Sequence, residues 1–263
     1  MNKGRKLTYF QLGIDIIKIY IFNKSLLIKG KTMKVKIFLT ALILTSFSNL
    51  YAIEADVWVY KVQPGHTEEA IELFEEAIKL SRSAGRNTSI AQQTFGKGGE
   101  FNFHWVDFYD SPEERANDNS YDSAEFSDFI NRFYKSGAVT TVRSYTMSLI
   151  DDQLCEFPGI VSVYVWKPNP GELSSVVEEF KAGSVLFERH GWEVDLWQEN
   201  IGGRDNLQFV MCSKSRLNEA KSNASLNSDE EWLSQQPNAP LWDSYSDNSK
   251  FMGSFELEPI VVD

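Results

Sequence analysis

Two segments of this sequence repeat each other, and this repeat constrains the fold more than any other feature. Residues 57–80, VWVYKVQPGHTEEAIELFEEAIKL, return in altered form as residues 161–186, VSVYVWKPNPGELSSVVEEFKAGSVL, with a two-residue insertion after the proline. Beyond the insertion an offset of 106 residues holds without a gap. A fixed period indicates repeated structural units, so we predict a tandem duplication of a unit of about 100 residues. The identical pairs are Gly65 and Gly171, Glu72 and Glu178, Phe74 and Phe180, Leu80 and Leu186, Gly85 and Gly191, Gln92 and Gln198, Gly96 and Gly202, and Phe103 and Phe209.

Each half of the repeat predicts the same order of elements. A β-branched and aromatic run opens each half as a strand, and a Pro-Gly turn then precedes a helix with apolar residues at helical spacing. Ser111, Pro112 and Glu114 form a capping-box start for a second helix in the first half. The predicted strands are 57–62, 89–95, 101–109 and 142–150 in the first half, and 161–166, 195–201, 207–213 and 251–257 in the second.

The resulting order, β-α-β-β-α-β, is that of the ferredoxin-like split βαβ unit. We therefore predict an α+β fold with two such units, residues 55–152 and residues 153–263. Each unit joins its first strand to a Pro-Gly turn and a helix. The third strand of the first unit runs into the pattern W-x-D…SPEERAND…SAEFSDF at residues 105–129.

These features resemble the dimeric α+β barrel superfamily with its two subunits fused in one chain. The resemblance covers about residues 55–262. It implies two antiparallel sheets packed as a barrel, helices on the outside, ligands between the sheets, and a monomer. No single family is assigned. Antibiotic-biosynthesis-type monooxygenases carry a histidine that would fall near Asn119 or Ser120 here, and neither of these residues is a histidine. The Asn, Trp and His set of haem-degrading relatives also cannot be placed on matching motif positions.

The amino-terminal fifth of the chain differs from the rest. Residues 33–52, MKVKIFLTALILTSFSNLYA, combine two lysines, an apolar run and the small residue Ala52 at a cleavage point, which is the layout of a secretory signal peptide. The apolar run is shorter than the ~20 residues that a membrane-spanning helix needs. We expect export to the periplasm or out of the cell, without stable membrane association after cleavage. Residues 1–32 are interpreted as an over-extended amino terminus.

Charge is divided unevenly along the chain, and this division excludes two kinds of partner. Residues 1–52 hold nine Lys and Arg and one acid, which leaves 17 basic and 36 acidic residues in the remainder, a net charge of about −19. A body this acidic repels phosphate backbones and anionic lipid headgroups. We therefore expect no nucleic-acid partner, while a neutral or cationic small molecule remains open.

Side-chain alternation predicts which residues line the space between the sheets. Adjacent strand residues point to opposite faces, so His104 and Trp105 cannot both face one cavity. The polar positions Asn102 and Gln208 suit the barrel interior, and aromatics with a polar tip on each tyrosine suit it on the first strands. The predicted ligand-binding residues are Trp58, Tyr60, Asn102, His104, Tyr164, Trp166 and Gln208.

Three histidines and two cysteines are the residues with the most reactive side chains. His104 is the candidate catalytic residue, as a general base or a donor to a ligand; alternatively it is a neutral histidine bonded to a neighbour. His66 and His190 are interpreted as structural, and no spacing resembles a metal site. Cys155 and Cys212 either form a disulfide, which an oxidising compartment would allow, or are two separate thiols.

Two function classes and a third alternative follow. The first is an exported protein that binds a small, largely apolar molecule between its sheets. The second is a monooxygenase-like enzyme, either cofactor-free or haem-using: no cofactor is evident from a motif, and haem is not excluded. The third is a structural or interaction module whose barrel is filled by its own side chains.

Overall fold

The structure is a computed structural model that describes residues 53–96, 102–151, 154–155, 159–235 and 247–262. All of these residues belong to the unit Tyr51–Asp263. The predictions for residues 1–32 and 33–52 lie outside the described residues. Among the helices that the structure describes, none is long and apolar enough to cross a membrane.

The two halves have the same order of strands and helices, as the sequence predicts. The first half contains β1 (Glu54–Val62), α3 (Thr67–Ser83), β2 (Asn87–Gly96), β3 (Asn102–Tyr109), α4 (Pro112–Asn117), a 3₁₀ turn (Ser120–Asp122), α5 (Ala124–Lys135) and β4 (Val139–Leu149). The second half contains β5 (Ile160–Pro168), α6 (Leu173–Arg189), β6 (Glu193–Glu199), β7 (Leu207–Ser213), α7 (Arg216–Leu226), α8 (Glu230–Gln235) and β8 (Ser249–Pro259). The predicted α+β class is confirmed.

Local sequence signals account for most of these elements, with one exception. Ser111 accepts a hydrogen bond from Glu114 N at 3.1 Å and Glu114 Oε2 accepts one from Asp110 N at 2.6 Å, so α4 begins where the capping residues predict. Helix α7 is not predicted by periodicity. Its buried residues are Ser222 and Leu226, which do not make an apolar stripe.

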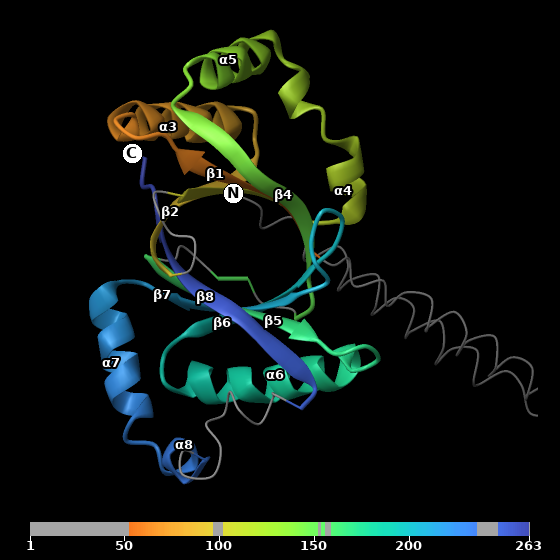
Figure 1. The fold of residues 1–263 in the computed structure, drawn as a ribbon, viewed down its shortest axis with the longest axis vertical. Coiled ribbons are helices and arrows are strands. Elements are labelled where there is room, and N and C mark those ends of the chain that lie inside the picture. The colour runs from red at the N-terminus through yellow and green to blue at the C-terminus, as the bar shows by residue number, and fades with distance from the viewer. Residues whose placement is uncertain (1–52, 97–101, 152–153, 156–158, 236–246, 263) are drawn as a thin grey trace, which may run out of the picture. The chain divides into compact units, whose positions relative to one another are not determined.

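The eight strands form one closed antiparallel barrel in the order β1-β3-β2-β8-β5-β7-β6-β4. The first half contributes the neighbours β4, β1, β3 and β2, and the second half contributes β8, β5, β7 and β6. Helices α3 and α5 cover the first set from outside, and α6 and α7 lie on the opposite side against the second set (Figure 1). Closure therefore requires two seams between the halves, β2 with β8 and β4 with β6.

The outer faces of both sheets are packed by matching aromatic pairs. Phe74 of α3 stacks on Phe103 of β3 with ring centroids 4.7 Å apart. Phe180 of α6 meets Phe209 of β7 at 5.5 Å. All four side chains are at most 2% exposed, so these rings fix each first helix to its own sheet. The repeated phenylalanines thus occupy equivalent positions in the two halves.

One glycine stands at each seam. Gly96 (φ +109°) and Gly202 (φ +75°) adopt left-handed backbone conformations that glycine tolerates best. A Cβ on Gly96 would lie 2.4 Å from Ser254 O of β8, and a Cβ on Gly202 would lie 2.5 Å from Ser144 O of β4. Because these glycines are partners in the repeat, both seams depend on the same close backbone approach.

Replacing Gly202 by alanine tests this dependence. We expect Gly202→Ala to lower the free energy of unfolding by roughly 2–4 kcal/mol, because it adds both φ strain and a backbone clash. Gly171→Ala is the matched control: Gly171 has φ +88° but nothing within 4 Å of the added Cβ. It should cost about 1 kcal/mol in urea unfolding. Equal losses in the free energy of unfolding of the two variants would contradict the claim that the close backbone approach at the seam contributes to stability.

Candidate functional site

A cavity of about 1020 Å³ lies inside the barrel. It reaches the surface near the carboxyl terminus, because Val261 lines it and is 83% exposed. Small and branched side chains make up most of its wall, since the inward positions of the strands carry residues of this kind. They include Val57, Ala91, Val106, Val163, Val210 and Leu257.

The structure corrects the predicted faces of the two first strands. Trp58 and Tyr60 pack against the helices of the first half, while Val57 and Val59 of β1 face the interior. The polar tips that favoured the interior find partners elsewhere: Tyr60 Oη lies 3.5 Å from Tyr134 Oη of α5. Large rings fill the space under the helices better than valines would.

The second half shows the same correction. Tyr164 and Trp166 of β5 pack against the helices of their own half, whereas Val163 and Val165 belong to the interior cluster. The prediction that Trp58, Tyr60, Tyr164 and Trp166 line the cavity is therefore wrong.

The predicted face of the third strands agrees with the structure. His104 of β3 and Gln208 of β7 line the cavity and are 6% and 4% exposed. Asn102 is also buried on the inward face of β3, but it is not part of the cavity wall. Trp105 lies on the other face, against the helices. The structure thus brings two of the seven predicted residues into one cavity.

The contacts of His104 define its protonation. Gln93 Nε2 donates to Phe95 O at 3.3 Å, so Gln93 Oε1 lies toward His104 Nε2, 3.4 Å away. Burial, with a smaller contribution from the charge of Arg143, lowers the pKa of His104 to about 4. The ring is therefore neutral near pH 7, with its proton on Nε2 and a lone pair on Nδ1.

Gln208 belongs to a buried polar network that sequence reasoning missed. Its Nε2 donates to Tyr145 Oη at 3.1 Å and to Glu199 Oε1 at 2.8 Å. Glu199 is 1% exposed and accepts a further bond from Arg143 Nη2 at 2.8 Å. A buried carboxylate needs such partners, so this network is a satisfied ion pair with an adjacent tyrosine. Burial raises the pKa of Tyr145, which keeps its hydroxyl protonated.

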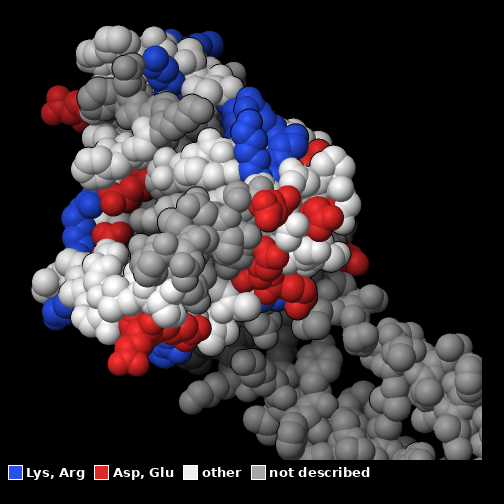
Figure 2. Space-filling view, turned by 60° about the horizontal axis from the view of Figure 1, so that its bottom comes forward, with Lys and Arg blue, Asp and Glu red and all other residues white. Residues whose placement is uncertain are grey.

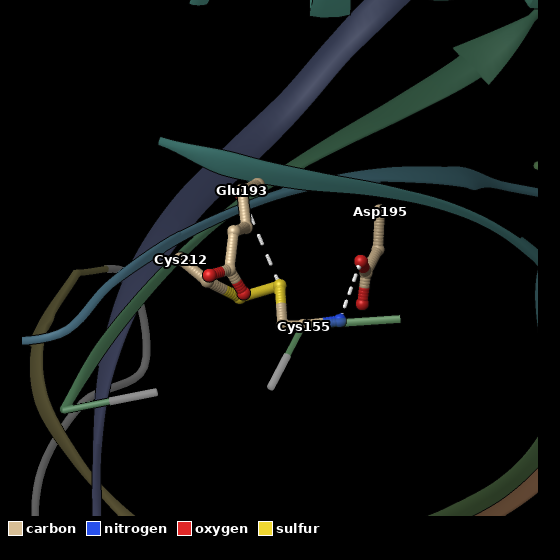
Figure 3. Close-up of a disulfide and its surroundings, with 4 residues drawn as sticks. All are labelled: Cys155, Glu193, Asp195 and Cys212. Atoms are coloured by element: carbon tan, nitrogen blue, oxygen red, sulfur yellow. Dashed lines mark hydrogen bonds between the residues drawn. A yellow bond between two sulfur atoms is a disulfide. The ribbon is translucent and has the colours of Figure 1, made fainter. Parts of the chain in front are cut away.

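Cys155 and Cys212 form a disulfide beside the buried carboxyl group of Asp195, an acid that sequence reasoning missed (Figure 3). All three residues line the cavity. The disulfide was one of two alternatives for these cysteines. A signal for Asp195 and Glu199 exists in the sequence: both are acids within EVDLWQE, a strand otherwise rich in apolar residues. The sequence does not show that these two side chains point inward, because closure of the barrel decides which face of the strand is inside.

The described side chains do not provide an evident metal or haem site. Cys155, Asp195 and Cys212 are a cluster of metal-ligating residue types, but both thiols are consumed by the disulfide. His104 is the histidine that lines the cavity; its ring stacks on Phe255 with centroids 5.0 Å apart, and Nε2 faces Gln93. An axial bond from Nε2 to haem iron would displace Gln93, so this arrangement does not fit haem.

The pH dependence of stability should report the burial of His104. A folded pKa of about 4, below the ordinary 6.5, means that protonation favours unfolding as the pH falls from about 6.5 to 4. Lowering the pH from 7.5 to 4.5 should therefore reduce the free energy of unfolding of wild type by roughly 2–3 kcal/mol more than that of His104→Gln, as measured by urea unfolding. His66, whose side chain is 43% exposed, supplies the control His66→Gln, which should follow wild type. Parallel pH profiles for wild type and His104→Gln would show that His104 is not held neutral.

Comparison with known proteins identifies the fold but no family. No protein-family model matches the sequence, and no curated protein matches it. A candidate monooxygenase from Fusobacterium nucleatum subsp. nucleatum ATCC 25586 is 11% identical, with 81% of this chain and 94% of that chain covered at a TM-score of 0.57. An anthrone oxidase-like protein is 10% identical, with 81% and 93% covered at 0.53. A candidate monooxygenase from Lactobacillus acidophilus NCFM is 10% identical, with 81% and 100% covered at 0.51. The chain is therefore similar in fold to these α+β barrels, in agreement with the superfamily that its sequence resembles.

Proposed function

We propose that this protein binds a small, largely apolar molecule inside its barrel. The observation that carries the proposal is the cavity of about 1020 Å³ between the two sheets. Ligand pockets of proteins have volumes of roughly 300–1,000 Å³ and mostly apolar walls. A barrel filled by its own side chains, the structural alternative, would not leave this space.

The polar groups in the wall indicate an uncharged ligand with one or two polar atoms. Glu199 and Arg143, which contact the wall residues Gln208 and Tyr145, neutralise each other, and burial opposes any further isolated charge. The Tyr145 hydroxyl accepts from Gln208, which leaves its proton for a ligand oxygen. On the face drawn in Figure 2, patches of Asp and Glu lie among patches of Lys and Arg, but the chain outside residues 1–52 has a net charge of about −19, which disfavours an anionic ligand.

We also propose that the protein is exported as a monomer and arose by tandem duplication. The signal-peptide layout of residues 33–52 and the disulfide support export, since disulfides persist in oxidising compartments. The closed barrel supports a monomer, because one chain supplies both sheets. The equivalent glycines at the two seams support the duplication.

Filling the cavity should abolish binding. We expect wild type to bind the neutral fluorescent probe 1-aminoanthracene at one site per chain. Val106→Trp places an indole in the cavity and should weaken binding at least tenfold, which is about 1.4 kcal/mol. Val142→Trp makes the same substitution on β4 at a side chain that is 57% exposed, and should stay within twofold of wild type. Unchanged affinity in folded Val106→Trp would contradict binding in the barrel.

A second candidate function is cofactor-free oxygenation, favoured by the unprotonated Nδ1 of His104. In this reaction Nδ1 takes a proton from a CH₂ group activated by a neighbouring carbonyl or aromatic ring. The carbanion transfers one electron to O₂, the two radicals combine to a peroxide, and loss of water leaves a ketone. One oxygen atom enters the substrate and the other leaves as water. The folds described as monooxygenases and anthrone oxidase-like support this candidate.

Oxygen uptake with anthrone as the substrate tests the enzyme candidate. His104→Gln removes the base and should slow turnover at least 100-fold, within the range of general-base contributions. His66→Gln should not change the rate. Turnover that survives in folded His104→Gln would exclude His104 as the base. Binding of 1-aminoanthracene without any oxygen uptake would leave the binding function alone.

A further inference from the structure

The disulfide lies in the cavity wall instead of at the outer surface. It joins Cys155, in the connection between β4 and β5, to Cys212 of β7, with Cα atoms 6.2 Å apart. Cys212 is 3% exposed and Cys155 is half-buried, and both line the cavity. A small reagent inside the cavity could therefore reach the sulfur atoms.

The carboxyl group of Asp195 stands beside both sulfur atoms. Asp195 belongs to β6, the neighbour of β7, and its Oδ1 accepts a hydrogen bond from Cys155 N at 2.9 Å (Figure 3). A carboxylate oxygen and the two Sγ atoms all lie within 4.8 Å of one another. Asp195 is 3% exposed. At this separation one water can carry a proton from the carboxyl group to either sulfur.

The surroundings of Asp195 favour a protonated carboxyl group near neutral pH. Burial, with a smaller contribution from the nearby acids Asp151 and Glu193, raises the pKa of Asp195 to about 7. Hydrogen bonds from Cys155 N and the Trp197 side chain oppose this shift. A disulfide that only fastens the chain to β7 has no need of a buried acid, which costs stability when it ionises.

We propose that Cys155, Cys212 and Asp195 form a thiol–disulfide exchange site for a low-molecular-weight thiol that enters the cavity. Asp195 acts in it as proton donor to the leaving sulfur, and as proton acceptor in the reverse direction. This activity goes beyond ligand binding and uses groups that the binding and oxygenation proposals leave unassigned.

The exchange proceeds in two balanced steps. A thiolate attacks Sγ of Cys155, the more exposed of the two residues, so that a mixed disulfide forms, the Cys155–Cys212 bond breaks and the electron pair passes to Cys212 Sγ. Asp195 protonates that sulfur as it leaves. A second thiolate then attacks the thiol-derived sulfur and releases the small disulfide and the Cys155 thiolate, which takes up a proton. In sum, two small thiols are oxidised to one disulfide, and the protein disulfide is reduced to two thiols.

The pH dependence of reduction by 2-mercaptoethanol tests this proposal on the full chain. The folded protein is reduced under native conditions, and its reduced cysteines are trapped with iodoacetamide and counted by mass spectrometry. Each rate of reduction is then divided by the concentration of 2-mercaptoethanol thiolate. The proton donor is present below pH 7 and lost above it. The rate per thiolate should therefore fall about tenfold between pH 6 and pH 8. Reduction that occurs only when the protein unfolds in urea would overturn the proposal.

Two variants separate proton donation from a structural effect. Asp195→Asn keeps an oxygen for Cys155 N but cannot donate this proton, so its rate per thiolate should be at least tenfold lower at pH 6 and independent of pH. Glu193→Gln also removes one negative charge but leaves the Asp195 carboxyl group in place. Its rate should still depend on pH, with the midpoint at lower pH, because Glu193 raises the pKa of Asp195. An Asp195→Asn profile that matches wild type would overturn the proposal. If Asp195→Asn does not fold, the wild-type and Glu193→Gln profiles still decide: a flat wild-type profile contradicts the proposal.

Discussion

Closure of the barrel at two seams is the constraint on which the interior depends. Backbone pairing of β2 with β8 and of β4 with β6 converts two four-stranded sheets into one ring, and every strand then has one face turned inward. Gly96 and Gly202 permit the close backbone approach at these seams. Without closure, the valines that line the cavity would be exposed to water, and burial of this surface is itself a force that holds the halves together.

Much of this arrangement could be predicted from the sequence, and the limits have a physical cause. The period of 106 residues, the Pro-Gly turns and the Ser111 cap predicted the order of elements, because these signals are local. The faces of the first strands were mispredicted. A tyrosine with a polar tip suits a wet cavity or a helix-covered core equally well, and the partner that decides, Tyr134 for Tyr60, is distant in sequence. The inward direction predicted for His104 and Gln208 agrees with the structure, because polar side chains are poorly suited to a helix-covered core.

Besides His104, the inward positions divide into a hydrophobic wall and two polar groups of different character. Around Gln208, every charge has a partner: Glu199 receives hydrogen bonds from Arg143 and Asn206 as well as from Gln208 itself. At Asp195 the carboxyl group has hydrogen bonds but no cation that the structure shows bound to it, and its pKa rises. The first arrangement suits recognition of a neutral polar atom, and the second suits proton transfer. The partners of Gln208 and the acid beside the disulfide were missed from the sequence, because these groups assemble from strands of both halves or from a linker.

The account as a whole rests on one claim: the inward faces of the strands line a ligand space, and the aromatic outward faces do not. NMR of protein labelled at the methionine methyl groups tests it, since Met147 lines the cavity and Met211 packs under the helices, and each residue is 6% exposed. On titration with 1-aminoanthracene, ring currents should shift the Met147 methyl signal and leave Met211 in place. A shift of Met211 with Met147 unchanged would contradict the account.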